Sequence, residues 1–337
     1  MIKRLIVKNL NGKHDFDLTF HPDINIFIGK NGAGKTTLMK LIWALVSGNI
    51  DILFEDKIYF DYLRVESIKN YYELTFDRVA NKVQYTAFPD DKNEISIQIL
   101  KFNPQKYTIE EDNFQLLDNI NTLFFPTFRR IEGGFGLNLH TPIAKKVQDV
   151  LSEILISFEG DTLTHKFITS VSTNDVIELL SKEYANIAKN IIDLQTKLLK
   201  EVATKTNGEL KKYLEQGQID KEILQKPFTE LSQLVKDIFN KGIKITENIS
   251  IGDEANAISA DKLSSGEKQM LSFFAYNMFY KKAAIFIDEP EISLHTDWQK
   301  VLFPSLIAQG TENQFFVATH SPFIYAKYPD KTFNLSK

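Results

Sequence analysis

The chain has 337 residues, of which 43% are hydrophobic and 25% charged, which is the balance of a globular protein with one or two domains. Its formal net charge of −4 gives no general attraction to nucleic acid or to anionic membranes, so either kind of binding requires a local patch. The absence of cysteine excludes disulfides, thiolate nucleophiles and cysteine-ligated zinc, and the absence of a signal-peptide core or a long apolar run predicts a cytoplasmic protein without a membrane span.

The first chemical motif follows two strands that we expect at residues 1–9 and 15–20. The segment NIFIGKNGAGKTTLMKLIWALVSG, which begins at Asn25, is typical of a strand, a glycine-rich loop and a helix. Residues 29–36 match the phosphate-loop pattern G-x-x-x-x-G-K-[ST] in full and in the expected structural setting. The glycines let successive backbone N–H groups surround a β-phosphate, and the helix N-terminus adds positive potential.

Each position of this motif has an expected partner on ATP·Mg²⁺. Lys35 is expected to reach the β- and γ-phosphate oxygens, the Thr36 hydroxyl to bind Mg²⁺, and Thr37 to contact the α-phosphate. The residues predicted to bind ATP in this segment are Gly29, Asn31, Gly32, Ala33, Gly34, Lys35, Thr36 and Thr37.

Residues 51–125 contain short β-branched and aromatic runs separated by turn residues, which predict an antiparallel β layer. The segment LFFPTFRRIEGGFG, residues 123–136, predicts a strand that breaks at Pro126, followed by a basic pair and a glycine-rich loop.

From about residue 141 to 240 the pattern becomes helical. Apolar residues at spacings of three and four form one stripe, consisting of Val176, Leu180, Tyr184, Ile187, Ile191, Leu194 and Leu198. We favour a helix that packs on its own domain. The alternative is a two-stranded antiparallel coiled-coil stub with a helix near residues 218–240.

A small-residue segment, KLSSGEKQML at residues 262–271, precedes another apolar helix. Ser264, Ser265, Gly266 and Glu267 have the composition of an N-terminal cap, which is one interpretation of them. A strand, AAIFIDE, then ends in Asp288 and Glu289. At the carboxyl end of a buried strand, Asp288 is placed to hold Mg²⁺ through water and Glu289 to polarise an attacking water. Acidic residues also end strands for structural reasons, but the complete phosphate loop favours the catalytic interpretation.

After a helix that we expect around residues 296–308, a third strand, QFFVATHSP from Gln314, ends at His320. A lone histidine at a strand end is more often structural than catalytic. At the carboxyl edge of a parallel sheet, however, it lies where ligands bind, and His320 is predicted to contact the γ-phosphate.

In their order along the chain, GKNGAGKTT, LSSGEKQ, IFIDEPE, SLH and ATHSP resemble the motifs of the ABC-type ATPases of the SMC, RecF and OLD-like branch. The resemblance covers roughly residues 1–50 and 245–325. It implies a homodimer with composite ATP sites, in which Ser264, Ser265 and Gly266 close over the γ-phosphate held by the partner subunit. Glu267 of the same segment is also predicted to contact the nucleotide. It also implies that Ser293, Leu294 and His295 form a loop at the dimer interface.

The chain departs from that pattern where a strand should be followed by a glutamine that bridges Mg²⁺ and water. Thr127, Arg129 and Arg130 stand there instead, so either the register is shifted or an arginine contacts phosphate. No clear adenine-stacking aromatic is present, and Lys13, His14 and Phe16 are the candidates. The helical segment is too short for the long coiled coils of the repair and cohesin-type members.

The motifs also resemble the compact ATPases of bacterial anti-phage defence systems, such as the Septu ATPase PtuA. In those systems the ATPase works with a separately encoded effector. The stretch after His320 is too short for the Toprim nuclease of OLD proteins, so any nuclease is expected on another polypeptide, and DNA is a possible ligand.

These observations predict an α/β fold, a P-loop ABC ATPase head with a central, mainly parallel sheet, an antiparallel β layer and a helical insertion. The predicted segments are an N-terminal ATPase lobe at 1–135, the insertion at 136–245, and a C-terminal lobe at 246–337. The leading hypothesis is an ATP-hydrolysing dimeric switch of a DNA-associated or defence complex. The alternatives are the ATP-binding subunit of a membrane transporter and a nucleotide-dependent scaffold with negligible turnover. The SSGEK and DEPEISLH segments argue against the transporter.

Overall fold

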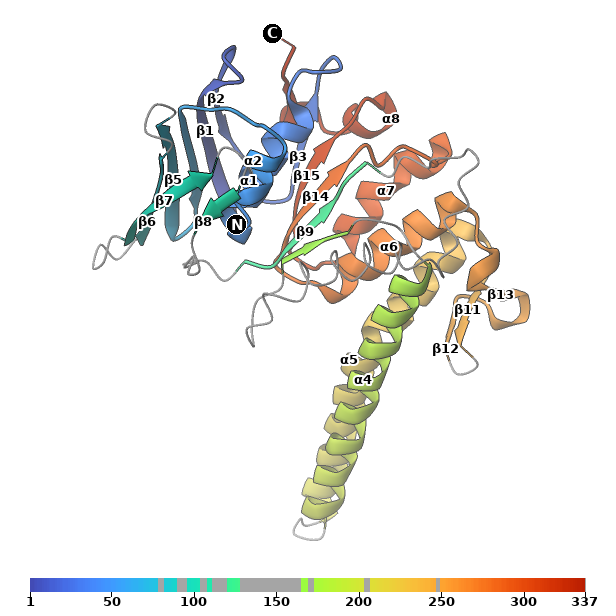
Figure 1. The fold of residues 1–337 in the computed structure, drawn as a ribbon. Coiled ribbons are helices and arrows are strands. Elements are labelled where there is room, and N and C mark those ends of the chain that lie inside the picture. The colour runs from blue at the N-terminus through green and yellow to red at the C-terminus, as the bar shows by residue number, and fades with distance from the viewer. Residues whose placement is uncertain are drawn as a thin grey trace, which may run out of the picture. The chain divides into compact units, whose positions relative to one another are not determined.

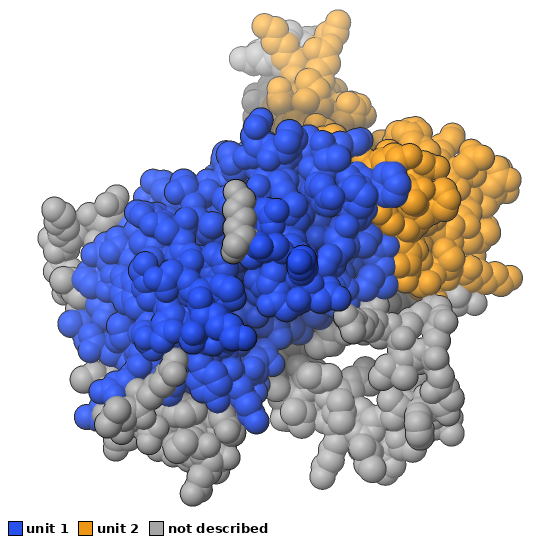
Figure 2. Space-filling model, turned by 90° about the horizontal axis from the view of Figure 1, so that it is seen from above, with its two compact units in different colours: residues 1–169, 281–292, 312–337 blue, residues 170–280, 293–311 orange. Residues whose placement is uncertain are grey.

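The computed structural model describes residues 1–77, 82–89, 96–103, 108–110, 120–127, 165–168, 173–202, 207–246 and 249–336. The chain forms two compact units, coloured separately in Figure 2. Unit 1 contains residues 1–169, 281–292 and 312–337, and unit 2 contains residues 170–280 and 293–311.

Unit 1 is built around a parallel sheet of six strands in the order β10-β9-β14-β15-β3-β16 (Figure 1). All of its neighbouring strands are paired parallel. The three strands β9, β14 and β15 are buried at every residue, which explains their uninterrupted apolar sequences. The strand bounds are β3 Ile24–Ile28, β9 Thr122–Phe125, β10 His165–Phe167, β14 Ala284–Asp288, β15 Gln314–Ala318 and β16 Thr332–Asn334.

A second sheet in unit 1 has seven strands in the order β2-β1-β4-β5-β6-β7-β8, each paired antiparallel with its neighbour. Its strands alternate between buried and more exposed residues, as in β4, where Leu63 and Val65 are buried. The predicted antiparallel layer is therefore confirmed. The bounds are β1 Ile2–Leu10, β2 His14–Thr19, β4 Tyr62–Ser67, β5 Asn70–Asp77, β6 Lys82–Pro89, β7 Ser96–Asn103 and β8 Thr108–Glu110.

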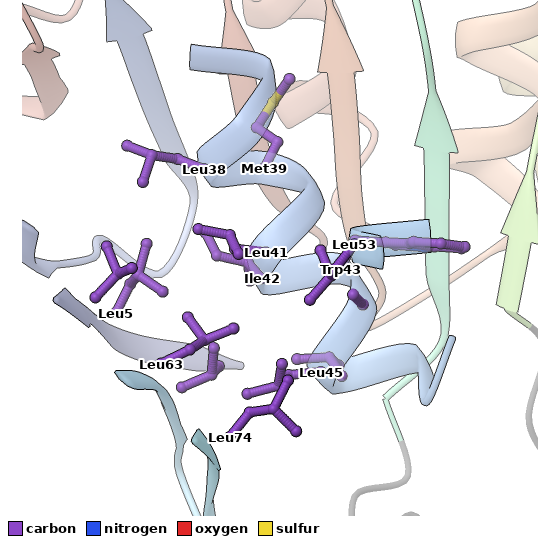
Figure 3. Packing of buried hydrophobic residues seen from close by; sticks show 14 of the residues in the cluster. Leu5, Leu38, Met39, Leu41, Ile42, Trp43, Leu45, Leu53, Leu63 and Leu74 are labelled. Atoms are coloured by element: carbon purple, nitrogen blue, oxygen red, sulfur yellow. The ribbon is translucent and has the colours of Figure 1, made fainter. Parts of the chain in front are cut away.

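Helix α1, Lys35–Ser47, is apolar on nearly all sides because it lies between the two sheets. Figure 3 shows Leu41 and Ile42 directed toward Leu5 of β1. On another side of the helix, Trp43 packs edge-on against Phe124 of β9, with ring centroids 5.8 Å apart. The two sheets therefore hold the helix that follows the phosphate loop in a fixed position. Unit 1 also contains α2 Asp51–Glu55, α8 Pro322–Tyr325 and the 3₁₀ turn η3 Pro329–Lys331.

In unit 2, α4 (Thr173–Val202) and α5 (Asn207–Phe239) lie side by side as a helical hairpin (Figure 1). They run antiparallel, since Tyr184 meets Phe228 while Leu198 lies against Gly217. The predicted stripe lies wholly on α4, which packs against α5 along the hairpin and against α6 of the same unit. Gly217 lies within α5. Because it has no Cβ, the Leu198 side chain of α4 can pack closely against its backbone.

The helical pattern expected from about residue 141 is contradicted at residues 165–167, which form β10 before α4 begins. The expected start itself lies outside the described residues. All three residues of β10 pair in parallel with β9, with His165 opposite Thr122 and Phe167 opposite Phe124. Residues 128–164 lie outside the described residues, and so do Arg129, Arg130 and the predicted glycine-rich loop.

Unit 2 also contains α6, Ser265–Phe279, and α7, Thr296–Ala308. Both α4 and α5 contact α6. A small sheet has the order β12-β11-β13, with β11 Ile243–Thr246, β12 Ile249–Ile251 and β13 Ile258–Ser259, and the 3₁₀ turns are η1 Glu254–Asn256 and η2 Ala260–Lys262. The small-residue segment at 262–271 therefore belongs to the same compact unit as the helical hairpin. The predicted three-part division places this segment in the C-terminal lobe and the hairpin in the insertion.

Candidate nucleotide-binding site

The phosphate loop connects β3 to α1 and has the backbone conformation that its glycines allow. Gly32 has φ 80° and Gly34 has φ 92°, both in the left-handed region that side chains disfavour. Gly34 is also the N-cap of α1, and no side chain caps that helix end. The first N–H groups of α1 are therefore available to an anion.

Lys35 is the buried cation of this loop, with only 7% of its surface exposed. Its ammonium donates to the carbonyl oxygens of Gly29 at 3.0 Å and Lys30 at 3.4 Å, and lies 2.8 Å from Nε2 of His320. Because an ammonium has no lone pair, Nε2 of His320 must be the acceptor in this contact. Lys35 and His320, predicted from separate motifs, are thus brought together.

Burial lowers the pKa of the Lys35 ammonium. The nearby carboxylates of Glu289, Asp288 and Glu291 act in the opposite direction and are outweighed. A polyanionic ligand near Lys35 would raise the pKa of this ammonium again, because negative charge stabilises its protonated form. A buried ammonium of this kind therefore suits a phosphate group.

Asp288 ends β14 at the same sheet edge and is 5% exposed. The Thr36 hydroxyl lies 3.0 Å from its Oδ1 and 2.9 Å from its Oδ2, and the Thr127 hydroxyl donates to Oδ2 at 2.7 Å. The predicted pair Thr36 and Asp288 is therefore in direct contact. The described residues contain no group of three or more histidine, aspartate or glutamate side chains arranged for a metal.

Glu289 follows Asp288 in a left-handed conformation with φ 49°, and its N–H donates to the Ala318 carbonyl at 2.8 Å. A non-glycine residue in this region is strained and is held there by its surroundings. The strain turns the chain out of β14 directly after Asp288, at the edge where the phosphate loop lies.

The small-residue segment forms a complete capping box at the start of α6, in unit 2. The Ser264 hydroxyl accepts from the Glu267 N–H at 3.3 Å, and the Glu267 carboxylate accepts from the Ser264 N–H at 2.8 Å. Glu267 also forms an ion pair with Lys241, just beyond α5. Its carboxylate is therefore engaged within unit 2, and its contact with a nucleotide stays a prediction.

Gly266 packs against the loop that contains Ser293, Leu294 and His295. A Cβ on Gly266 would lie 2.5 Å from the Ser293 carbonyl oxygen and 3.2 Å from the Trp298 ring. Ser293 itself has φ 70°, and His295 is the N-cap of α7. Two motifs that the sequence placed at a dimer interface are thus packed together in unit 2.

Comparisons with known proteins place these motifs in a family. The profile of the AAA_15 family, described as an AAA ATPase domain, matches residues 1–325. The chain belongs to this family.

Curated relatives of this AAA ATPase domain include nuclease and repair proteins. The endonuclease GajA of Bacillus cereus (strain HuB5-5) is 20% identical over 367 residues, covering 91% of this chain and 53% of GajA. The GajA of Bacillus cereus (strain VD045) is 43% identical over 63 residues, covering 17% of this chain and 11% of that protein. The DNA replication and repair protein RecF of Staphylococcus haemolyticus (strain JCSC1435) is 35% identical over 74 residues, covering 21% and 20% of the two chains. The chain thus spans about half or less of the relatives it matches.

Among solved structures, the Smc head bound to the C-terminal winged-helix domain of ScpA matches with 13% identity and a TM-score of 0.41, covering 96% of this chain and 91% of the other. The recombination mediator protein RecF bound to an ATP analogue matches with 14% identity and a TM-score of 0.39, covering 96% and 94%.

Two residues of this ATPase domain that support the site were missed from the sequence. The Glu291 carboxylate accepts from the Thr319 hydroxyl at 2.8 Å and from the His320 N–H at 2.7 Å, and so holds the His320 loop. The Ser336 hydroxyl accepts from the Lys30 N–H at 2.7 Å, beside Gly29. The second glutamate in IFIDEPE was a signal for Glu291, but its partner lies 29 residues away.

The adenine candidates gain no further support. His14 and Phe16 lie on β2, an edge strand of the antiparallel sheet, with ring centroids 5.9 Å apart. Lys13 precedes that strand. The assignment of these residues to adenine stays a prediction.

Proposed function

We propose that this AAA ATPase domain binds and hydrolyses ATP with Mg²⁺ and acts as a cytoplasmic dimeric switch. The observation that carries the proposal is the convergence at one sheet edge of the phosphate-loop pair Lys35 and Thr36 with Asp288 and His320. Lys35 and Thr36 begin the helix that follows β3, Asp288 ends β14, and His320 follows β15. These strands are parallel neighbours in one sheet, so their carboxyl ends lie at the same edge.

The donor set fits magnesium. Mg²⁺ keeps several waters and takes one or two protein oxygens together with phosphate oxygens, so it does not require a dedicated group of carboxylates. Thr36 Oγ1 and Asp288 would hold it, and bound there it would neutralise charge on the phosphates. Lys35 binds the β- and γ-phosphate oxygens, which offer its ammonium stronger acceptors than the loop carbonyls do.

Glu289 is the proposed general base. It directly follows Asp288, which ends β14, and its negative charge raises the pKa of Lys35 against the effect of burial. It would accept the proton of the attacking water. His320, as a neutral imidazole beside Lys35, would contact the γ-phosphate and report its presence.

The second half of the proposal is that the start of α6 completes the site of a partner subunit. The capping box satisfies the Glu267 N–H, while the N–H groups of Ser265 and Gly266 remain at the open end of the helix. Together with the Ser265 hydroxyl, these groups suit a γ-phosphate.

The relatives supply the wider setting. GajA is an endonuclease and RecF a DNA replication and repair protein. We infer that this chain is the ATPase component of a DNA-associated or anti-phage defence complex and that it works with a separate effector such as a nuclease. None of the relatives named above is a transporter. Among the described residues, no helix has both the length and the apolar character needed to cross a membrane.

A mixing experiment tests the composite site. Ser265→Arg should abolish hydrolysis but leave ATP binding within a few-fold, since the bulky side chain blocks closure and Ser265 lies outside the phosphate loop. Lys35→Ala should also be inactive. A heterodimer of the two carries both lesions in one composite site and neither in the other, so ATPase activity should return on mixing.

The control for the mixing experiment is each variant mixed with itself at the same total concentration. ATP-dependent dimer formation is followed in parallel by light scattering. Absence of ATP-dependent dimers, in the wild-type protein and in Glu289→Gln, would refute the composite site.

A second variant tests the His320 loop. Glu291→Ala should lower the ATPase turnover roughly tenfold to a hundredfold, since it removes two hydrogen bonds to a charged acceptor, each worth about 1.5–3 kcal/mol. The affinity for ATP should change less than about threefold because Lys35 and the loop are intact. Steady-state turnover and the Kd of a fluorescent ATP analogue separate the two effects.

Glu291→Gln keeps one oxygen acceptor and should retain more turnover than Glu291→Ala. Glu254→Ala, at an exposed position in η1, is the charge-matched control and should behave as the wild type. Equal loss of binding and turnover in Glu291→Ala would show that the residue acts on the phosphate loop instead.

A further inference from the structure

Thr127 occupies a position at the site that the phosphate-loop motifs do not assign. It lies two residues beyond β9, after Pro126. The neighbouring strand is β14, and the two are in register with Phe125 opposite Ile287. Thr127 is therefore beside the end of β14, where its hydroxyl donates to Oδ2 of Asp288 at 2.7 Å.

Pro126 explains why the side chain can reach Asp288. Proline has no N–H to donate to a ladder, so it ends the pairing of β9 with its neighbour. The pairing of β9 with β14 ends at Phe125, and the side chain of Thr127, which follows the proline, meets the end of the adjacent strand. Among the described residues that follow β9, it is thus Thr127 whose side chain contacts Asp288.

The Asp288 carboxylate receives hydroxyls from two sides. The Thr36 hydroxyl reaches both of its oxygens, whereas Thr127 contacts only Oδ2. The carboxylate is buried, so its orientation depends on these partners and not on water. Without Thr127, the hydrogen bonds to this carboxylate from the described part of the chain would come from Thr36 alone, and Thr36 is also the residue expected to bind Mg²⁺.

We propose that Thr127 is a positioning residue of the magnesium site, which fixes the Asp288 carboxylate toward the cation that Thr36 binds. The proposal rests on the proposed ATP·Mg²⁺ binding. It assigns to a threonine hydroxyl the place at this strand end where the related ATPases have a glutamine. Thr127 acts through Asp288 and does not touch the nucleotide, so its effect is on metal affinity and not on the phosphate loop.

The test measures binding of a fluorescent ATP analogue while Mg²⁺ is titrated, and again in EDTA. Thr127→Val keeps the shape of the side chain and removes the hydroxyl. It should raise the Mg²⁺ concentration for half-maximal enhancement of binding roughly tenfold to a hundredfold, the usual effect of removing a partner of a metal ligand. Affinity in EDTA should be unchanged. Thr127→Ser keeps the hydroxyl and should restore the wild-type Mg²⁺ dependence.

Thr122→Val is the matched control. Thr122 lies on the same strand at its other end, where its hydroxyl meets Nδ1 of His165 at 2.9 Å. Its Mg²⁺ dependence should equal that of the wild type. Thr127→Ala provides a second way to remove the hydroxyl, and thermal melting without nucleotide shows whether each variant is folded.

The outcomes are distinct. A Mg²⁺ titration of Thr127→Val that matches the wild type overturns the proposal, as does an equal loss of affinity in EDTA. A shift in Thr127→Val and Thr127→Ala that Thr127→Ser does not reproduce supports it. Failure of the wild-type protein to bind ATP with or without Mg²⁺ would instead refute the proposed function.

Discussion

Replacement of Lys35 by alanine is expected to abolish ATP binding at micromolar concentrations. The Lys35 ammonium is buried, and its three contacts lie in the phosphate loop and on His320. Removing one partner of a desolvated charge pair costs about 2–5 kcal/mol, which corresponds to roughly 30-fold to several thousand-fold in affinity. Isothermal titration calorimetry with ATP and Mg²⁺ measures the loss.

Lys30→Ala is the matched control for this prediction. Lys30 is an exposed lysine of the same loop, and the contacts described for it involve its backbone N–H and carbonyl oxygen. Its replacement removes the same charge from the protein but should leave the affinity within about threefold, as is usual for a surface charge. Micromolar binding that survives Lys35→Ala would show that the phosphate loop is not the nucleotide site.

The parts of the structure that local sequence determines were predicted well. The bounds of α7 agree with the expected 296–308, because an N-cap and an apolar pattern are both local. The same holds for the strand, loop and helix around Gly29, and for the capping box at Ser264. At the starts of α6 and α7, the cap is a hydrogen bond between a side chain and an N–H group only two or three residues apart.

Contacts between distant segments were harder to predict. Glu291 holds the His320 loop from 29 residues away, and Thr127 reaches Asp288 from 161 residues away. Contacts between residues so far apart in the chain produce no periodic pattern from which the sequence could predict them. Thr127 stood out only as a departure from a family motif, and the structure shows the physical reason for it at the strand end. The pairing of Lys241 with Glu267 likewise depends on how α5 packs against α6.

Residues 165–167 were predicted as part of a helical region for a related reason. Apolar residues in a short segment suit a helix or a strand equally, and only a partner decides between them. His165–Phe167 pairs in parallel with β9 and is therefore a strand. The helical hairpin, by contrast, has a long amphipathic stripe, which identifies α4 without knowledge of its partner.

Replacement of Glu289 by glutamine is expected to separate ATP binding from hydrolysis. The amide has the shape of the carboxylate but does not accept a proton, and a general base contributes about 10²–10⁴-fold to a rate. Single-turnover hydrolysis should therefore slow by that factor. The left-handed backbone at Glu289 is held by its N–H bond to Ala318, which the substitution retains, so the fold should be preserved.

Binding in Glu289→Gln should be at least as tight as in the wild type. The substitution removes one of the carboxylates near Lys35 and with it a repulsion toward the γ-phosphate. The ATP-bound dimer should consequently persist, and light scattering with ATP should show a long-lived dimer that the wild-type protein forms only transiently. Glu312→Gln, an exposed position with the same charge change, serves as the control and should hydrolyse ATP at the wild-type rate. Unchanged turnover in Glu289→Gln would move the general base to another residue, and the Glu291 and His320 variants would then be the next to measure.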